Sequence, residues 1–313
     1  MNHTPVLLNE VIAALAPAPG MRMIDCTYGA GGYTRAIISH GAEVMAIDQD
    51  PNVIAQASPP NGAKLVQGKF ADLADIANRE NFSPVDGVVF DIGVSSMQLD
   101  EAERGFSFLR DGPLDMRMSQ SGPSAADIVN SESEEELAHI IFTLGEEPAS
   151  RKIAKTIVRA RAEAPITRTH QLAEIVARAA RAKPGTHPAT RTFQALRIHV
   201  NSELDQLRSG LNASLQVLRP GGTLAVVTFH SLEDRIVKQF MDSESGKESQ
   251  PSRHMPLQTE TSAEQHRLTV KQRKAIAPSP AEREQNPRAR SAKLRVATRT
   301  PFFESGMLME NAA

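Results

Sequence analysis

The stretch from Asp91 to Ser96, DIGVSS, brings together a carboxylate, a glycine and two hydroxyl groups directly after the apolar run VDGVVF. A carboxylate at this position can accept hydrogen bonds from an amine or balance the charge of a cationic ligand. Gly93 allows the backbone to approach such a ligand closely. Ser95 and Ser96 offer hydroxyl groups, although serines placed here can equally cap a following helix. Asp91 is therefore the leading candidate for a side chain that touches a ligand or a reacting amine.

A second pattern that could hold a ligand is the segment MRMIDCTYGAGGYTRAII, residues 21–38. Gly31 and Gly32 lie between an apolar run and a helical pattern, a layout that presents a helix N-terminus to a ligand. Asp48 ends the next apolar run, where an acid can accept hydrogen bonds from both hydroxyls of a ribose. The turn reads GAGG and not the full dinucleotide fingerprint, and Asp25 before it would repel a pyrophosphate. Because an acid attracts the ammonium of a methionine, the pattern favours S-adenosylmethionine (SAM) over a nicotinamide dinucleotide.

The elements that must position these residues alternate between strand-like and helical patterns over the first 100 residues. This alternation predicts βαβ units and a parallel sheet. After residue 100 the apolar positions recur at spacings of three and four, which predicts helices, and a further strand follows a PGG turn. The sheet should therefore be interrupted by a helical insertion. The expected strands are 21–25, 41–48, 85–93 and 221–229, and the expected helices are 33–40, 52–57, 134–144, 150–162 and 169–182.

Composition narrows the class of protein. The single cysteine, Cys26, excludes a disulfide framework and a cysteine-cluster zinc site, and we expect a buried thiol and no bound metal. No apolar stretch approaches the roughly 20 residues that a membrane-spanning helix needs. The N-terminus lacks the pattern of a signal peptide. We therefore expect a cytoplasmic protein with no membrane partner.

The formal net charge of −2 conceals two basic segments. Residues 151–200 hold 11 Lys and Arg against 2 acids, and residues 251–300 hold 11 against 4. Basic segments on an otherwise acidic chain suggest a polyanionic partner. The alternative is that these residues simply coat solvated helices.

Six motifs occur in a fixed order along the chain: DCTYGAGGYTR, DIGVSSMQLD, ERGFSF with DGPLDMRM, HPATRTFQALRIHVNSEL, FHSLEDRIVK and NPRARSAKLR. Together they closely resemble the RsmH family, also called MraW, over nearly the whole chain. Members of that family are ribosomal RNA small-subunit methyltransferases that modify N4 of a decoding-centre cytidine. The resemblance implies an α/β fold, a class I SAM-dependent methyltransferase (Rossmann-like) core with an inserted helical domain. The implied boundaries are 1–104 and 201–300 for the core, with a basic C-terminal segment 243–300, and 105–200 for the insertion that recognises substrate.

The resemblance also implies which residues contact SAM. Tyr33 stands where the family commonly has histidine, so the expected contact there is through the backbone. An adenine ring could stack on Phe70, although a core phenylalanine is the plain alternative. Asp91 is expected to be catalytic as well as cofactor-binding. The implied cofactor residues are Gly31, Gly32, Tyr33, Asp48, Phe70, Asp91 and Gln98.

The substrate side is expected on two later motifs. Residues 189–211 should form one long helix that begins after Pro188, with a polar stripe of Thr190, Gln194, Arg197 and Asn201 on the face opposite its apolar stripe. Such a stripe is often merely solvated, but the resemblance implies contact with RNA. Asp234 is expected to pair with Arg235 or to position substrate, and the motif NPRARSAKLR to contact phosphates as part of a tail. The implied substrate-binding residues are Arg191, Gln194, Arg197, Asn201, His230 and Arg235.

The function that this resemblance implies is SAM-dependent (cytosine-N4) methylation of 16S rRNA, in the small ribosomal subunit or in an assembly intermediate. A homodimer is compatible with the sequence. One alternative is a SAM-dependent methyltransferase that acts on another nucleic acid or on protein. Others are a non-catalytic ribosome-assembly factor that binds RNA, and a nicotinamide dehydrogenase. Competition between RNA, DNA and protein substrates distinguishes rRNA methylation from methylation of another nucleic acid or of protein. Measurable binding of SAM counts against a non-catalytic factor, and comparing the binding of SAM and NAD tests the dehydrogenase.

Overall fold

The computed structural model describes residues 5–180, 185, 187–247 and 266–301, so residues 248–265 of the predicted basic segment lie outside the described residues. The chain divides into two compact units. Unit 1 contains Met1–Asp48, Ala57–Ile92 and Leu207–Ala313. Unit 2 contains Gln49–Gln56 and Gly93–Gln206.

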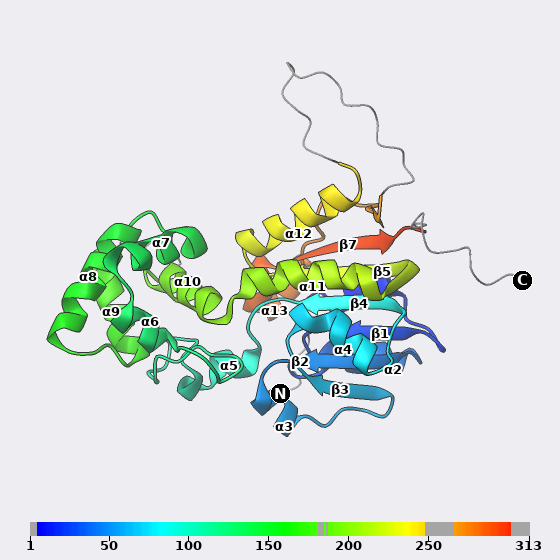
Figure 1. Ribbon diagram of the computed structural model, residues 1–313, viewed down its shortest axis with the longest axis horizontal. Helices are drawn as coiled ribbons and strands as arrows, with labels where there is room; N and C mark the ends of the chain where they lie inside the picture. Colours follow the sequence, from blue (N-terminus) through cyan, green and yellow to red (C-terminus); the bar gives the residue numbers. More distant parts are fainter. Residues whose placement is uncertain (1–4, 181–184, 186, 248–265, 302–313) are drawn as a thin grey trace, which may run out of the picture. The chain divides into compact units, whose positions relative to one another are not determined.

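Unit 1 is built on a seven-stranded sheet with the order β3-β2-β1-β4-β5-β7-β6 (Figure 1). The strands from β1 to β5 pair in parallel, and β7 joins β5 in the antiparallel direction. An outward order 3-2-1-4-5 is that of the Rossmann-like fold. The predicted α/β class is therefore confirmed. The strands are β1 Arg22–Asp25, β2 Glu43–Asp48, β3 Ala63–Gln67, β4 Val85–Asp91, β5 Leu218–Thr228, β6 Leu268–Thr269 and β7 Lys293–Arg299.

The central strands end on acids at one edge of this sheet. Strand β4 lies between β1 and β5, and its residues Val88, Val89 and Phe90 are fully buried, as expected for a strand covered on both faces. Asp25 ends β1 and Asp91 ends β4, next to Val227 of β5. Ligands of open parallel sheets bind at this carboxyl edge. The topology therefore gathers the predicted cofactor residues of unit 1 at one place.

The C-terminal motif NPRARSAKLR is not a tail, which corrects that expectation. It forms a 3₁₀ helix and then strand β7, in which Leu294 and Ala297 are buried. Its backbone pairs with β5 from Thr223 to Thr228, so the motif completes the sheet. The 3₁₀ helix is η4 Pro287–Ser291. The other helices in the described part of unit 1 are α1 Leu8–Leu15, α2 Gly32–Ser39, η1 Phe70–Asp72, α4 Leu73–Arg79, α12 Ser231–Glu244 and α13 Pro280–Gln285.

Unit 2 is helical and has its own hydrophobic core, formed by side chains such as Leu137, Ile153, Leu172 and Leu196. Helices α7 to α10 contact one another and are drawn in green in Figure 1. The helices expected over 52–57, 134–144 and 150–162 are confirmed to within a residue at each end. The helix expected over 169–182 ends at Ala179, because Ala180 is extended, and residues 181–182 lie outside the described residues. The helices are α3 Pro51–Gln56, α5 Ser96–Asp100, η2 Ala102–Arg104, α6 Ala125–Ser131, α7 Glu134–Gly145, α8 Ser150–Glu163, α9 Thr169–Ala179 and α10 Thr190–Asn201.

The expected single helix over residues 189–211 is wrong, because the chain breaks it into two. Ser202 adopts a left-handed conformation, with φ of 49°, and ends α10. Helix α11, Glu203–Val217, begins at the next residue and runs from unit 2 into unit 1. No proline or glycine marks the break, so the pattern of apolar residues could not reveal it.

Candidate active site

The glycine-rich turn of unit 1 needs its glycines for two different reasons. Gly31 precedes α2 with a φ of 73°, which strains any residue that carries a Cβ. A Cβ on Gly31 would also lie 2.8 Å from the Tyr28 ring. Gly32 has no such φ, but a Cβ there would come within 2.1 Å of Pro5 Cγ. The turn is therefore packed tightly from both sides, and the N-terminus of α2 lies directly behind it.

Asp48 is tied to this turn. Its Oδ2 accepts a hydrogen bond from the backbone N–H of Gly29 at 2.8 Å. The bond fixes the carboxylate at the end of β2, in the position predicted for an acid that holds a ribose.

Asp91 combines burial with a missing partner. Its backbone N–H donates to Thr27 Oγ1 at 2.8 Å, which joins the ends of β1 and β4. Among the described residues, no group forms a hydrogen bond with its Oδ1, and this atom is shielded from solvent. An unpartnered buried carboxylate oxygen is rare and calls for an explanation. A ligand N–H group or a cation would supply the missing partner.

Three acids share this part of unit 1 and shape its electrostatics. Burial, together with the charges of Asp25 and Glu233, raises the pKa of Asp91 to about 8. Burial also raises the pKa of Asp25, although a hydrogen bond from Thr34 Oγ1 at 2.6 Å opposes the shift. A cation would relieve this repulsion and restore the charge of Asp91. The acids therefore fit the ammonium and sulfonium charges of SAM.

Two predicted cofactor residues have side chains that are already engaged within unit 1. Tyr33 is buried, and its hydroxyl donates to the backbone carbonyl of Val6. Phe70 packs edge-on against Phe90, with 5.7 Å between the ring centroids. Phe70 is only partly buried, so its contact with Phe90 does not preclude stacking of an adenine on it. Cys26 is a buried free thiol, as expected, and burial raises its pKa well above the ordinary value.

Gln98 belongs to unit 2, where it caps a helix. Its Oε1 accepts from the Ser95 N–H at 3.0 Å, and the Gln98 N–H donates to Ser95 Oγ at 3.2 Å. Its Nε2 donates to Asp50 Oδ2 at 2.9 Å, and Arg104 reaches the same oxygen at 2.7 Å. Ser95 is thus a capping residue, which was the plain alternative for this serine. A cofactor contact from Gln98 would require one of these bonds to be exchanged.

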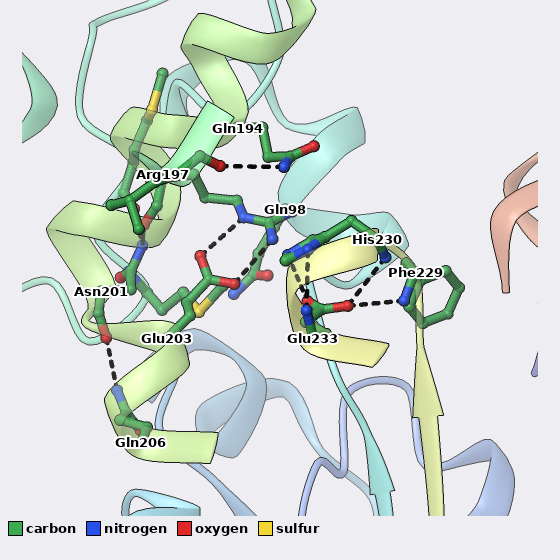
Figure 2. A network of polar contacts seen from close by, with 12 residues as sticks. Gln98, Gln194, Arg197, Asn201, Glu203, Gln206, Phe229, His230 and Glu233 are labelled. Carbon is green, nitrogen blue, oxygen red and sulfur yellow. Dashed lines mark hydrogen bonds and ion pairs between the residues drawn. The ribbon is translucent and has the colours of Figure 1, made fainter. Parts of the chain in front are cut away.

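His230 and Glu233 form a compact pair at the start of α12 (Figure 2). His230 Nδ1 accepts from the Glu233 N–H at 3.3 Å, and His230 Nε2 lies 2.9 Å from Glu233 Oε1. Glu233 Oε2 accepts from the Phe229 N–H at 2.7 Å. Glu233 is fully buried and acts electrostatically on Asp91. The sequence placed Glu233 at the carboxyl end of a strand but assigned it no role, and it gave no signal for Thr27, because a strand-end threonine is a common feature.

Asp234 pairs with two cations of strand β7, which the sequence did not predict. Asp234 accepts from Arg295 Nε at 2.6 Å and from Lys293 Nζ at 2.8 Å. Successive side chains along a helix diverge, whereas β7 brings these two cations across from α12. Lys293 and Arg295 are therefore committed to an ion-pair network inside unit 1 and do not form a phosphate-contacting tail.

The polar stripe of α10 is bonded within unit 2 (Figure 2). Arg197 forms a two-pronged ion pair with Glu203, at 2.8 and 2.9 Å. Asn201 is buried and donates to the backbone carbonyls of Met116 and Arg197, each at 2.8 Å. It also accepts from the Met118 N–H at 2.8 Å. These bonds hold the loop before α6 against α10, so the side chains of Arg197 and Asn201 are engaged by protein partners.

The other predicted substrate residues differ in their surroundings. Arg191 donates to the backbone carbonyl of Glu146 at 2.7 Å, and Gln194 donates to that of Leu144 at 3.3 Å. Arg235 is exposed on α12 in unit 1.

The predicted cofactor and substrate residues fall into two sets, one in each unit. Unit 1 holds Gly31, Gly32, Tyr33, Asp48, Phe70, Asp91, His230 and Arg235, and unit 2 holds Gln98, Arg191, Gln194, Arg197 and Asn201.

Neither a metal cluster nor a membrane-spanning helix is found in the described part of the chain. There, no group of three or more His, Cys, Asp or Glu residues is placed to hold a metal ion. Within the same residues, none of the helices has the length and apolar character needed to cross a membrane.

Comparison with known proteins places the chain in a family. A ribosomal RNA small subunit methyltransferase H of Cereibacter sphaeroides is 57% identical over 306 residues, covering 95% of this chain and 90% of that protein. The protein of the same name from Xanthobacter autotrophicus is 56% identical over 316 residues, covering 98% and 90%. One from a Caulobacter species is 54% identical over 305 residues, covering 96% and 93%. Residues 1–300 match the MraW methylase family, and the chain belongs to that family.

Proposed function

We propose that this protein is a SAM-dependent methyltransferase that modifies N4 of a decoding-centre cytidine in 16S rRNA. The observation that supports the proposal most directly is the buried, unpartnered Oδ1 of Asp91 at the carboxyl edge of the sheet. A methyltransferase that acts on an amine needs an acceptor at this point, because an accepted N–H bond raises the electron density on nitrogen. The identity with proteins named ribosomal RNA small subunit methyltransferase H supports the choice of substrate.

SAM, when bound, supplies an electrophilic methyl group. Asp48 would hold its ribose, and the N–H groups at the start of α2 would face its carboxylate. Asp91 and its acidic neighbours would balance its positive charges. Because the ordinary pKa of an aspartate is 3.8 and that of Asp91 is about 8, this carboxylate is protonated at neutral pH until a cation arrives.

The ionised Asp91 would then accept a hydrogen bond from the N4 amine of the cytosine. The methyl–sulfur bond would break as the nitrogen–methyl bond forms, with S-adenosylhomocysteine as the leaving group. The nitrogen must then lose one proton, which Asp91 would receive or pass to water. No covalent enzyme intermediate is needed, and the buried Cys26 thiol takes no part. The target base must leave its stack to reach the site, which is easier in an irregular RNA loop than in a regular duplex.

The test is transfer of a labelled methyl group from SAM to small ribosomal subunits, followed by nucleoside analysis of the RNA. We expect label in N4-methylcytidine with the unaltered protein. We expect loss of at least about a hundredfold in rate with Asp91→Ala, the range typical of removing a positioned proton acceptor. Glu43→Gln, which changes an exposed carboxylate in β2, is the matched control and should retain full activity.

Other outcomes would point to the alternatives. Label in DNA or protein in preference to RNA would indicate a different methyltransferase. Binding of SAM without transfer to free 16S rRNA, subunits or assembly intermediates would favour a non-catalytic assembly factor. Sedimentation of the same preparation tests the homodimer.

A further inference from the structure

The segment Pro5–Leu7, which we call the N-terminal strap, lies against the glycine-rich turn. A Cβ on Gly32 would come within 2.1 Å of Pro5 Cγ, so the proline ring fills the space that a side chain would otherwise occupy. Gly32 is the first residue of α2. The strap therefore packs beside the first turn of the helix whose N-terminus the proposed function assigns to the cofactor.

Two polar contacts hold the strap from opposite sides. The hydroxyl of Tyr33, on α2, donates to the backbone carbonyl of Val6. The carboxylate Oε1 of Glu282, on α13, accepts from the backbone N–H of Leu7 at 2.7 Å. Val6 and Leu7 are both buried. Glu282 lies 275 residues from Leu7 in the sequence, so this contact is not a consequence of local chain geometry.

The backbone of the strap is strained where Glu282 holds it. Leu7 has φ of 56° and ψ of 29°, a left-handed conformation that is rare for a residue with a bulky side chain. Such a conformation persists only where the surroundings enforce it, and enforced strain is concentrated at functional sites. Because α1 begins at Leu8, a relaxed Leu7 would redirect the whole strap.

The Tyr33 hydroxyl, which holds Val6 of the strap, also interacts electrostatically with acids of the candidate site. Burial raises the pKa of the Tyr33 hydroxyl well above its ordinary value, and the charges of Asp91, Asp25, Glu282 and Glu10 raise it further. The hydroxyl that holds Val6 is therefore in the neighbourhood of the carboxylate that carries the proposed chemistry, and it stays protonated as a donor.

We propose that Tyr33 and Glu282 are positioning residues that hold the N-terminal strap as one wall of the cofactor site. This inference rests on the proposed function. The wall excludes water from the N-terminus of α2, which strengthens the attraction between its N–H groups and the carboxylate of SAM. The competing explanation is that the strap only anchors α1 to the sheet and contributes to stability alone.

The experiment measures the affinity for S-adenosylhomocysteine by calorimetry, together with the KM for SAM and kcat on small subunits. Tyr33→Phe and Glu282→Ala each remove one hydrogen bond to the strap. We expect each to raise Kd and KM about tenfold, which corresponds to one lost hydrogen bond, while kcat at saturating SAM stays within about twofold. Glu282→Gln retains an acceptor oxygen and should restore most of the affinity.

A control variant separates positioning from stability. Ser133 caps α7 in unit 2, where its side chain accepts from the Glu136 N–H at 3.1 Å. Ser133→Ala should lower the melting temperature without changing Kd. The inference is overturned if Tyr33→Phe and Glu282→Ala behave like this control, with a lower melting temperature and an unchanged Kd. If the unaltered protein itself fails to bind S-adenosylhomocysteine and SAM, the proposed function fails first, before any variant is compared.

Discussion

The Asp48 carboxylate accepts a hydrogen bond from the Gly29 N–H at 2.8 Å, and this one contact joins the end of β2 to the glycine-rich turn. The two residues belong to different strand–helix connections that meet at the carboxyl edge of the sheet. A bond between them fixes the backbone of the turn and the direction of the acid at the same time. The predicted ribose site and the predicted methionine site are therefore coupled through the protein.

The coupling predicts different results for two substitutions of Asp48. Asp48→Asn keeps an acceptor for the Gly29 N–H but loses the negative charge, so the turn should survive while the ribose is held less tightly. Asp48→Ala loses both. We expect Kd for S-adenosylhomocysteine to rise about tenfold for Asn and at least about a hundredfold for Ala, since hydrogen bonds to charged groups contribute about 1.5–3 kcal/mol. Calorimetry on both variants measures the two losses. Equal losses would mean that Asp48 acts only through its charge on the ribose and that its bond to the Gly29 N–H does not matter for binding.

The raised pKa of Asp91 predicts that cofactor binding releases a proton. The empty protein holds this carboxylate protonated up to a pH of about 8, and a bound cation favours its ionised form. At pH 7 the released proton is taken up by the buffer. The binding heats measured in phosphate and in Tris should therefore differ by nearly the difference between the ionisation heats of the two buffers for one proton. The affinity for the cofactor should rise with pH until about 8. Asp91→Asn should abolish both effects. Equal heats in the two buffers would show that Asp91 does not change its protonation.

The same pKa predicts how Asp91 affects stability. The folded-state pKa of about 8 exceeds the ordinary value of 3.8, so stability from this group is fully present below pH 3.8 and is lost as the pH rises towards 8. The slope is up to about 1.4 kcal/mol per pH unit. Asp91→Asn should therefore stabilise the empty protein more at pH 8 than at pH 5. Denaturant unfolding of both proteins at pH 5 and pH 8 measures the difference in their free energies of unfolding. The prediction is contradicted if Asp91→Asn is less stable than the unaltered protein at pH 8.

The sequence was sufficient to predict the α/β core, and the reason is physical. Strands β1, β2 and β4 are buried on both faces, so they read as continuous apolar runs that end on Asp25, Asp48 and Asp91. The connection from a strand through a turn to a helix then places their carboxyl ends together. Local patterns thus predicted that these acids end neighbouring strands of one sheet.

Structural features that depend on partners far away in the sequence could not be predicted from local patterns. Strand β7 carries basic residues and resembled a tail, because its partners on α12 and β5 lie far away in the sequence. The break at Ser202 is enforced by residues on either side, including the Arg197–Glu203 ion pair. The partners of Tyr33 and Leu7 could not be predicted either, since backbone groups carry no sequence signal.

Asn201 is expected to act on the structure of unit 2 before any effect on substrate. Its side chain satisfies the Met118 N–H and the Met116 carbonyl, and both would lose this partner in Asn201→Ala. We expect a loss of about 2–4 kcal/mol in the stability of unit 2, since buried unsatisfied groups cost about 1–3 kcal/mol each. Faster hydrogen exchange at the Met118 amide, with an unchanged Kd for S-adenosylhomocysteine, would show this. A raised KM for small subunits with Met118 still protected would instead make Asn201 a substrate contact.

A stripe of cations on α8 is the part of unit 2 best suited to bind the RNA backbone. The stripe consists of Arg151, Lys152, Lys155 and Arg159, all exposed, whereas Ile153 and Ile157 of the same helix are buried. Spacings of three and four residues place the cations on one side of the helix, over a length of about 12 Å. That length spans about two phosphate groups of an extended strand, so a continuous backbone can follow it.

Replacing all four cations of this stripe by glutamine should weaken RNA binding through charge alone. Each phosphate contact contributes about 0.7–0.9 to the slope of log KM for small subunits against log salt concentration. With two phosphates, we expect the slope to fall by about 1.4–1.8. The kcat and the Kd for S-adenosylhomocysteine should stay unchanged, because α8 carries none of the expected cofactor residues. A variant with Arg151→Lys and Arg159→Lys keeps the charge and should keep the slope. If the glutamine variant also keeps it, the stripe is only a solvated face, and the RNA backbone must be held by other cations.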